Sequence, residues 1–579
     1  MSGSRKLLCS NSMSKRTLLC IALGIVLSSS SLASDRLKLH ANRQALSPLA
    51  IVESAYQSGK ISEGERLTLK LQYLLDQPSF PAAYAVEGVH GAPLKCGTDI
   101  VLEVKKRWSE LTNDQQALAA GFFARPATDT HYVSPGGFFK IHYDSSGFHG
   151  VSMADDDANS IPDFIDLAAK SFDSSWNYYH NTLGFLLPPS DGAFGGDSLY
   201  DVYIRFVGAY GITFAESPGP EPWNDYTSYI LVHNNFETGF PPNDDPDGTA
   251  AGALKVTCAH EYFHAAQLAY DRDDDLWMYE SGATWEEEEI FPLVNDNHQF
   301  LPFYYDEPDT FLTTSTGNFM YGGLVWPQFL TEKFGTAIMR DVWEAARFVD
   351  GVDALDSALA LYGSVTSKEY SDFVTWNFFS GNRFRPGYFS TGAEYPGIIY
   401  DHTLPASIFS SVTPQDPPDG LGANYIIWPT PPTPKGLLKL DFDGSDVVLW
   451  RVNIYLKDSA GNYLLEELST DILGKGQYIK YDYNKWDTIF IVPHVISQWQ
   501  NNNSYDFSTT VVPYGDADGS GDLNVGDAIY LIRYIFTDGP EPVHDIRMGD
   551  ADCGGNINIG DALAIVKYIF DGQELPCFE

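Results

Sequence analysis

The stretch Cys258-Ala259-His260-Glu261-Tyr262-Phe263-His264-Ala265 decides how this chain is organised, because it falls in a helix predicted over 250–270. Histidines four residues apart lie one turn apart on the same face of a helix. Two imidazoles placed in this way can bind one Zn²⁺ from one side. Glu261, next to the first histidine, is the predicted general base for a metal-activated water. The other helix faces are mostly apolar, which predicts a buried helix whose polar face opens into a cleft.

A catalytic zinc also needs a third protein ligand and one open position. Downstream, Trp277-Met278-Tyr279-Glu280-Ser281-Gly282-Ala283 offers Glu280, and Glu286 follows it. The His-Glu-x-x-His motif followed by Trp-x-x-Glu-x-Gly-Ala resembles the gluzincin metallopeptidases, in which a Glu on a second helix is the third ligand. The local context favours Glu280, although it follows the second histidine at a short spacing for this group. Glu286, which lies further from that histidine, remains the alternative.

The gluzincin resemblance also implies a tyrosine downstream of the third ligand that donates a hydrogen bond to the oxyanion. Tyr321 is the candidate for that catalytic role, within Phe319-Met320-Tyr321-Gly322-Gly323-Leu324. A packing role for Tyr321 is the alternative, since the chain contains 34 tyrosines. The resemblance implies a hydrolase, a zinc metallopeptidase that cleaves peptide bonds. We expect an endopeptidase, because no motif for capturing a free amino terminus is present.

The N-terminus, residues 1–33, has the features of a signal peptide. Four basic residues precede an apolar core over 18–27, and Ser31-Leu32-Ala33 is a small-x-small cleavage site. No interior stretch is long and apolar enough to span a membrane. The net charge is 36 − 77 = −41, which argues against nucleic acid as a partner. A secreted, extracellular protein that takes a protein or peptide substrate is expected, with association to the cell surface as a further option.

Residues 34–125 are predicted to form a helical, propeptide-like region, with one helix opening at Ser47-Pro48 and another over 105–120. Within it, Lys95-Cys96-Gly97-Thr98 resembles the Pro-Arg-Cys-Gly latch of matrix metallopeptidase zymogens, in which a thiolate fills the open position of zinc. A Cys96–Cys258 disulfide and an unpaired buried cysteine are the two alternatives. In the C-terminal module, Cys553 is expected to pair with Cys577.

Two further domains are predicted before the C-terminus. Residues 126–400 mix strands, over 137–143, 201–206 and 229–232, with helices, over 162–183, 250–270 and 321–334, and form the expected catalytic domain. Pro327 marks a kink or boundary within the last helix. Residues 401–512 begin with a region rich in Pro and Gly and continue as short strands, which predicts a β-sandwich.

Residues 513–579 contain a duplicated loop and helix, offset by 550 − 516 = 34 residues. Gly at position 6, Asn at 9 and Asp at 12 of each loop follow the EF-hand pattern, so the module is expected to bind two Ca²⁺. It resembles a type I dockerin, which implies a cohesin-type module or a cell-surface scaffold as partner. Gly554 at position 5 and apolar residues at position 10 depart from that pattern. The predicted ligands are Asp516, Asp518, Ser520, Asp522, Asn524 and Asp527 in the first loop, and Asp550, Asp552, Asn556, Asn558 and Asp561 in the second.

A third acidic loop, over 155–166, lies inside the catalytic region. Its oxygen-bearing residues fall at positions 1, 3, 5, 9 and 12 of a twelve-residue loop, so one more Ca²⁺ is expected there. Ser160 stands where Gly is usual, and an acidic turn that caps the following helix is the alternative. The predicted ligands are Asp155, Asp157, Asn159, Asp163 and Asp166.

Together these features predict a multidomain α+β chain with a gluzincin-like catalytic domain, a β-sandwich and a small all-α dockerin-like module. The expected function is a secreted zinc peptidase with Glu261 as general base. The alternative is a non-catalytic secreted binding or scaffold protein with a relic metal site. A structural zinc normally has four protein ligands, and the three found here favour catalysis.

Overall fold

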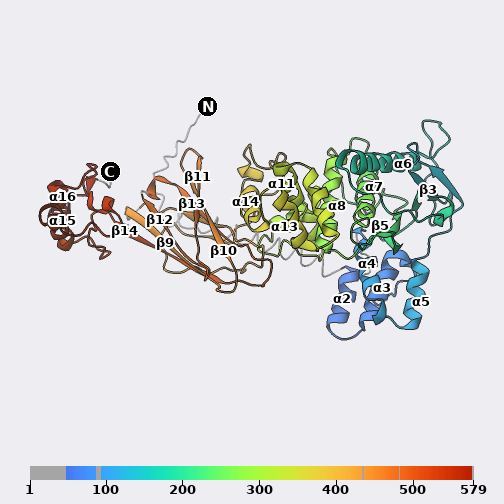
Figure 1. The fold of residues 1–579 in the computed structure, drawn as a ribbon, viewed down its shortest axis with the longest axis horizontal. Coiled ribbons are helices and arrows are strands. Elements are labelled where there is room, and N and C mark those ends of the chain that lie inside the picture. Colours follow the sequence, from blue (N-terminus) through green and yellow to red (C-terminus); the bar gives the residue numbers. More distant parts are fainter. Residues whose placement is uncertain (1–46, 86–92, 433–435, 482, 577–579) are drawn as a thin grey trace, which may run out of the picture.

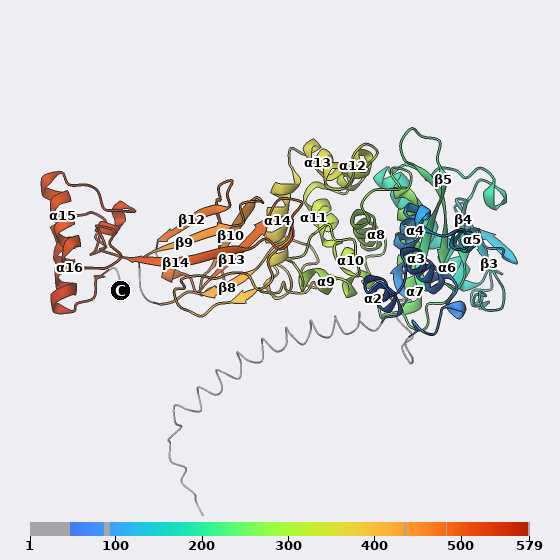
Figure 2. The same cartoon turned by 90° about the horizontal axis from the view of Figure 1, so that it is seen from below.

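The computed structural model describes residues 47–85, 93–432, 436–481 and 483–576. The chain is elongated: a part with helices around a sheet lies at one end, a part built of strands lies in the middle, and a helix pair lies at the far end (Figures 1 and 2). This mixture of helices and three sheets is compatible with the predicted multidomain α+β class. The predicted signal peptide falls outside the described residues. No helix of the described residues is long and apolar enough to cross a bilayer.

A six-stranded mixed sheet, in the order β1-β5-β6-β4-β3-β2, organises the first part. β3 pairs with β4 and β4 with β6 in parallel, and these strands are buried along nearly their whole length, as strands covered on both faces are. β1 is an edge strand that pairs in parallel with β5. The strands are β1 (Leu94–Cys96), β2 (Thr130–Val133), β3 (Phe139–Tyr143), β4 (Tyr200–Ile204), β5 (Ala209–Pro218) and β6 (Tyr226–Val232).

The two faces of this sheet carry different helices. Val202 and Ile230 face the main core with α6 and α7, whereas Tyr203 and Leu231, each one residue further on, face a second core with α3, α4 and α5. In Figure 1 the N-terminal helices, in blue, lie together on one side of the sheet. The helices are α2 (Pro48–Gln57), α3 (Glu63–Leu75), α4 (Thr98–Lys106), α5 (Asn113–Phe122), α6 (Asp163–Trp176), α7 (Thr249–Gln267) and α8 (Leu276–Ile290).

Local sequence explains several of these boundaries. Ser47 caps α2 with Pro48 at its first position, as predicted. The single helix predicted over 105–120 is wrong: the chain breaks between α4 and α5, and Thr112 starts α5 with a capping box to Gln115. The helix predicted over 321–334 is divided into α10 (Phe319–Gly322) and α11 (Val325–Phe334), and Pro327 lies in the first turn of α11, where its missing N–H costs nothing.

Short helices follow α8 and pack into the same main core. They bring Tyr321, at the third position of α10, against α8. The remaining helices of this part are α9 (Leu301–Tyr305), α12 (Ala337–Ala346), α13 (Gly351–Leu361) and α14 (Thr366–Phe378).

Two further sheets, ordered β11-β10-β13-β8-β7 and β12-β9-β14, form the middle part. Leu440 of β9 and Phe507 of β14 share one hydrophobic core with Ile454 of β10 and Ile491 of β13, so the sheets pack against each other. The strands are β7 (His402–Thr403), β8 (Ile426–Pro429), β9 (Gly436–Gly444), β10 (Trp450–Lys457), β11 (Tyr463–Leu468), β12 (Lys475–Tyr481), β13 (Thr488–Val495) and β14 (Tyr505–Pro513).

The C-terminal part contains two helices, α15 (Val525–Thr537) and α16 (Ile559–Asp571). Their first residues, Val525 and Ile559, are separated by the same offset as the two copies of the sequence repeat. A small core that includes Leu531 and Ile565 joins them. Cys553 is disulfide-bonded, and its predicted partner, Cys577, falls outside the described residues.

Candidate metal centre

Helix α7 carries His260, Glu261 and His264 at the centre of the first part. The helix is predicted from the sequence over 250–270 and confirmed over 249–267. All three side chains are buried, with at most 1 % of their surface exposed. The Nε2 atoms of His260 and His264 lie 3.1 Å apart, as expected for histidines one turn apart that turn the same ring edge toward one point.

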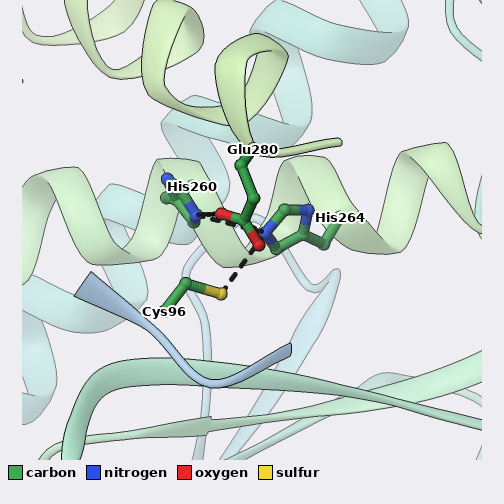
Figure 3. Close-up of side chains that lie close together, drawn as sticks. All are labelled: Cys96, His260, His264 and Glu280. Atoms are coloured by element: carbon green, nitrogen blue, oxygen red, sulfur yellow. Dashed lines mark hydrogen bonds and ion pairs between the residues drawn. The ribbon is translucent and has the colours of Figure 1, made fainter. Parts of the chain in front are cut away.

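Glu280, on the neighbouring helix α8, completes a three-residue group with these histidines. Its Oε2 lies 3.1 Å from Nε2 of His260 and 3.6 Å from Nε2 of His264 (Figure 3). Glu286, the alternative third ligand, does not belong to this group. It lies further along α8, at a position rotated by about 240° around the helix axis from that of Glu280. Burial, with the nearby Glu289, raises the pKa of the Glu286 carboxyl well above its ordinary value.

Cys96, at the end of β1, supplies a fourth donor atom. Its Sγ lies 3.4 Å from Nε2 of His264, and all four donor atoms lie within 4.8 Å of one another (Figure 3). The alternative of a Cys96–Cys258 disulfide is wrong, because both cysteines are free and buried. Cys258 precedes His260 by two positions on α7, so it faces away from the group and its Sγ lies 3.9 Å from the carbonyl oxygen of Ala168. The cleft predicted at the polar face of α7 is closed, because Cys96 of β1 lies against that face.

The second nitrogen of each histidine ring, Nδ1, contacts a side-chain oxygen of another residue. Nδ1 of His260 lies 2.8 Å from Glu287 Oε1, and Nδ1 of His264 lies 2.7 Å from Gln267 Oε1. A carboxylate and an amide oxygen only accept, so each Nδ1 donates its N–H, and with a metal bound each Nε2 would present its lone pair to that metal. Two ring nitrogens, a carboxylate oxygen and a sulfur thus converge on one point, an arrangement that a positive charge stabilises, either a metal ion or the proton that His260 holds.

The separations between these donor atoms fit a tetrahedral zinc. Bonds of about 2.0–2.1 Å to nitrogen and oxygen and about 2.3 Å to sulfur set the ligand atoms about 3.3–3.6 Å apart. Four of the six separations run from 3.1 to 3.6 Å, and the other two, from Sγ of Cys96 to His260 and to Glu280, are at most 4.8 Å. In the metal-free chain, burial lowers the pKa of His260, but hydrogen bonds to Glu280 and Glu287 outweigh it and raise that pKa to about 9. The group thus attracts positive charge, and its donor set suits Zn²⁺.

Glu261 points at the same region without belonging to the donor group. Its Oε2 accepts hydrogen bonds from Thr213 Oγ1 at 2.7 Å and from Thr98 Oγ1 at 3.2 Å, while its buried Oε1 has no hydrogen-bond partner in the described part of the chain. β5 approaches closely here: a Cβ at Gly211 would lie 2.5 Å from Cγ of Glu261. Glycine at 211 therefore makes room for the carboxylate.

Tyr321 lies beside the group, with its ring centroid 6.3 Å from that of His260. It packs in a small cluster with Cys96, Phe300 and Met320 and is 4 % exposed. Burial, followed by the nearby Glu280, raises the pKa of its hydroxyl well above the ordinary value. The hydroxyl therefore stays protonated and can donate a hydrogen bond near the metal position.

Several residues of this centre were not predicted. Glu287 belongs to a run of four glutamates over 286–289, a pattern typical of a solvated helix end, but it is 1 % exposed and contacts His260. It follows Glu280 by two helical turns, which places both on the same face of α8, and this signal identifies it. Gln267 follows His264 by three residues on α7, so helix spacing could also have identified it. Thr213 carries no such signal, because only the fold brings β5 to the site.

Substitution of Glu280 and substitution of Glu286 should have different effects on zinc affinity. Glu280→Gln is expected to weaken zinc binding by more than the about 10–100-fold that loss of an outer hydrogen-bond partner costs. Glu286→Gln should leave the affinity unchanged, because burial disfavours the charged form of this carboxyl and it lies outside the donor group. A competition titration with a zinc chelator measures both. Equal affinities of the two variants would contradict the assignment of Glu280.

The internal acidic loop brings three of its five predicted ligands together. Carboxylate oxygens of Asp155, Asp157 and Asp163 lie within 4.8 Å of one another. The Asn159 side chain instead donates to Asp157, and Asp166 pairs with Lys170. The loop backbone has left-handed residues at positions 4 and 6, Ala158 and Ser160, as both C-terminal loops do at their own positions 4 and 6. A metal bound in this loop would take its last carboxylate ligand from position 9, Asp163, and not from position 12, Asp166.

Each C-terminal loop gathers the carboxylates of positions 1, 3 and 12 into a group that could hold a metal. Asn524 and Asn558, predicted ligands at position 9, instead cap α15 and α16 through capping boxes with Asp527 and Asp561. Ser520 hydrogen-bonds to Asp516 through its backbone N–H. Asp522 and Asn556 are exposed and lie outside these groups. The groups are Asp516, Asp518 and Asp527 in the first loop, and Asp550, Asp552 and Asp561 in the second.

The first C-terminal loop makes a pH-dependent prediction. Burial, with the nearby carboxylates of Asp518 and Asp516, raises the pKa of Asp527 to about 6. The folded metal-free module then binds more protons than the unfolded chain, so its stability falls as the pH rises from about 4 to about 6. In EDTA, the melting temperature of this module in the full-length chain should fall over that range, and calcium at pH 7 should restore it. Asp527→Asn should reduce the pH dependence and leave the part that comes from Asp561 in the second loop, whose pKa burial also raises, and a transition insensitive to both pH and calcium would rule out this site.

Comparisons with known proteins add no relative to this picture: no protein-family model matches the sequence, and no curated protein matches it.

Proposed function

We propose that this chain is a secreted zinc-dependent peptidase with a gluzincin-like catalytic domain, and that it is latent while β1 is in place. One observation carries the proposal: the Nε2 atoms of His260 and His264 and Oε2 of Glu280 converge within 3.1–3.6 Å, with a buried carboxylate, Glu261, beside them. Three protein ligands, a general base and a cation between them are the parts of a hydrolytic zinc site. The signal-peptide features of residues 1–33 support secretion.

In this proposal His260, His264 and Glu280 hold the zinc. Zinc bound there would supply Lewis-acid activation of a water molecule and of the scissile carbonyl. Glu261 would take the proton from the attacking water and later deliver it to the leaving amine. Thr213 fixes one oxygen of Glu261, so the other oxygen stays available for the proton. Tyr321 would donate a hydrogen bond to the oxyanion, a contribution of about 10²–10³ in rate.

Cys96 and Thr98 support latency, because the short segment that carries them blocks both the metal position and the general base, Glu261. The thiol of Cys96 completes the donor group at the position a catalytic zinc leaves open. The hydroxyl of Thr98 donates to the base, Glu261. A substrate therefore reaches neither the metal position nor the base while β1 is in place. Activation requires that Cys96 withdraw.

A secreted scaffold with a structural metal site is the second candidate, and the fourth donor favours it, since structural zinc normally has four protein ligands. Glu261 argues against it. Its Oε1 is buried without a hydrogen-bond partner in the described part of the chain, which costs about 1–3 kcal/mol or more. A structural site gains nothing from this carboxylate, whereas a peptidase needs it as the base.

Casein zymography of the secreted protein separates the two candidates. A clear band that disappears with a zinc chelator and returns with added Zn²⁺ is the expected result. The matched control is addition of Ca²⁺ alone after chelation, which should restore the C-terminal module but not hydrolysis. Absence of hydrolysis in processed protein that still contains zinc would favour the scaffold.

We also propose that the C-terminal part is a dockerin-like calcium module linked through a β-sandwich. Its two helices expose matching apolar residues at equivalent positions of the repeat, which supports a docking role for this face. A cohesin-type module or a cell-surface scaffold is the proposed partner. A pull-down with cohesin-type modules in millimolar calcium tests this, and no binding would indicate a terminal cap. The exposed residues are Val525, Ile529, Ile532 and Phe536 on α15 and Ile559, Leu563, Val566 and Phe570 on α16.

A further inference from the structure

Lys95, the residue before Cys96, fills a closed acidic pocket next to the metal centre. Its ammonium group lies 2.8 Å from Oε2 of Glu287 and 2.6 Å from Oδ2 of Asp296. The three side chains are buried, with exposures of 0, 1 and 0 %. The ring centroid of Tyr210 lies 4.6 Å from the ammonium and that of Phe300 lies 5.7 Å from it, so aromatic faces complete the walls.

The walls of this pocket are held by contacts that do not involve Lys95. The carboxylate of Asp296 accepts hydrogen bonds from the Tyr210 hydroxyl at 3.3 Å and from Gln299 Nε2 at 3.0 Å. The other oxygen of Glu287 accepts from Nδ1 of His260. These residues come from β5, α7, α8 and the short helical turn Asp296–Gln299. The pocket is therefore preformed, and only its occupant comes from the N-terminal region.

β1 lies along β5 as an added strand. The N–H of Leu94 donates to the carbonyl of Gly208 and the N–H of Gly97 donates to the carbonyl of Gly211, both at 3.0 Å. Adding a strand to an exposed sheet edge is a common way to bind an extended peptide. Because Cys96 of β1 reaches the metal position, an extended peptide that replaces β1 along β5 could approach this centre in the same way. The side chain next to the residue at the metal position would then enter the acidic pocket, as Lys95 does.

We propose that Glu287 and Asp296 form a specificity pocket for lysine, so that the enzyme cleaves substrates with a lysine side chain beside the scissile bond. This inference rests on the proposed peptidase function. When β1 withdraws, two buried carboxylates lose their cation, and a neutral substrate side chain leaves them without a cationic partner. Sites built to pair with a substrate group reject analogues that lack it by about 10⁴–10⁵-fold. We expect at least a 100-fold preference for Lys over Met at one fixed position.

The first test needs no catalysis and uses the full-length chain. Lys95→Ala should lower the melting temperature and leave a cavity that takes an alkylammonium. Millimolar n-butylammonium should restore the transition, whereas n-butanol, which has a similar shape and no charge, should not. Equal effects of the two compounds would show that the pocket does not select a cation and would overturn the proposal.

The second test holds even if Lys95→Ala fails to fold. A peptide library is digested with the processed secreted protein, with Asp296→Asn and with the control Asp244→Asn, which removes an exposed carboxylate from the same region. Lysine should occupy one fixed position beside the cleaved bond for wild type and control, and Asp296→Asn should lower the ratio of Lys-peptide to Met-peptide cleavage rates at least tenfold. Hydrolysis without a lysine preference would overturn the pocket but leave the peptidase standing. No hydrolysis by any form would remove the proposed function and this inference together.

Discussion

Glu261→Gln is expected to abolish peptide hydrolysis by the processed protein while zinc remains bound. General-base catalysis contributes about 10²–10⁴-fold to such rates, so turnover should fall by at least that much. The amide keeps the size of the side chain and can still accept the hydrogen bond from Thr213 at Oε. It has no basic oxygen that can take a proton from water. Glu261 lies outside the donor group, so the zinc content should not change.

Turnover on casein and zinc per chain, measured on the same samples, check this expectation. Glu286→Gln is the matched control, since it removes a buried carboxyl from the neighbouring helix and should leave both quantities unchanged. Wild-type turnover of the Glu261 variant would show that this residue is not the base. Loss of zinc together with activity would show instead that Glu261 supports the metal site.

Cys96→Ser is expected to activate the unprocessed chain. A serine hydroxyl is a far poorer zinc ligand than a thiolate, so the segment that carries residue 96 would be held less firmly. Each 1.4 kcal/mol lost from the closed state raises the open population about tenfold, and a metal–thiolate bond contributes more than that. We therefore expect at least a tenfold rise in casein turnover before any processing of the N-terminal region.

Two variants make the Cys96 result specific. Cys258→Ser changes the other free buried cysteine, which faces away from the metal group, and should leave the chain latent. Thr98→Val frees Glu261 from one hydrogen bond but keeps the thiol in place, so it should not activate the chain either. Unchanged latency in Cys96→Ser would show that the cysteine is not the latch, and activation by Cys258→Ser would point to general loosening of the fold.

The parts of the centre that depend on local helix geometry could be predicted from the sequence. His260 and His264 lie on one face because four residues make about one turn, and the same rule turns Glu261 toward the same region. The two C-terminal loops could be predicted in the same way, from the constant offset of the repeat and from the glycine at position 6 of each loop. Gly521 and Gly555 adopt the left-handed backbone that those turns require.

The distant residues that meet helix α7 are known only from the packing of the elements. Glu280 and Glu286 both lie on α8, and the choice between them depends on how α8 packs against α7. The sequence leaves three roles open for Cys96. β1 is too short to show a periodicity that would predict which residues lie next to it. Its place is set by pairing with β5, in the middle of the chain, and by the burial of Lys95 between Glu287 and Asp296. Local spacing determines which residues share a face, whereas contacts between residues far apart in the chain are determined by how the elements pack.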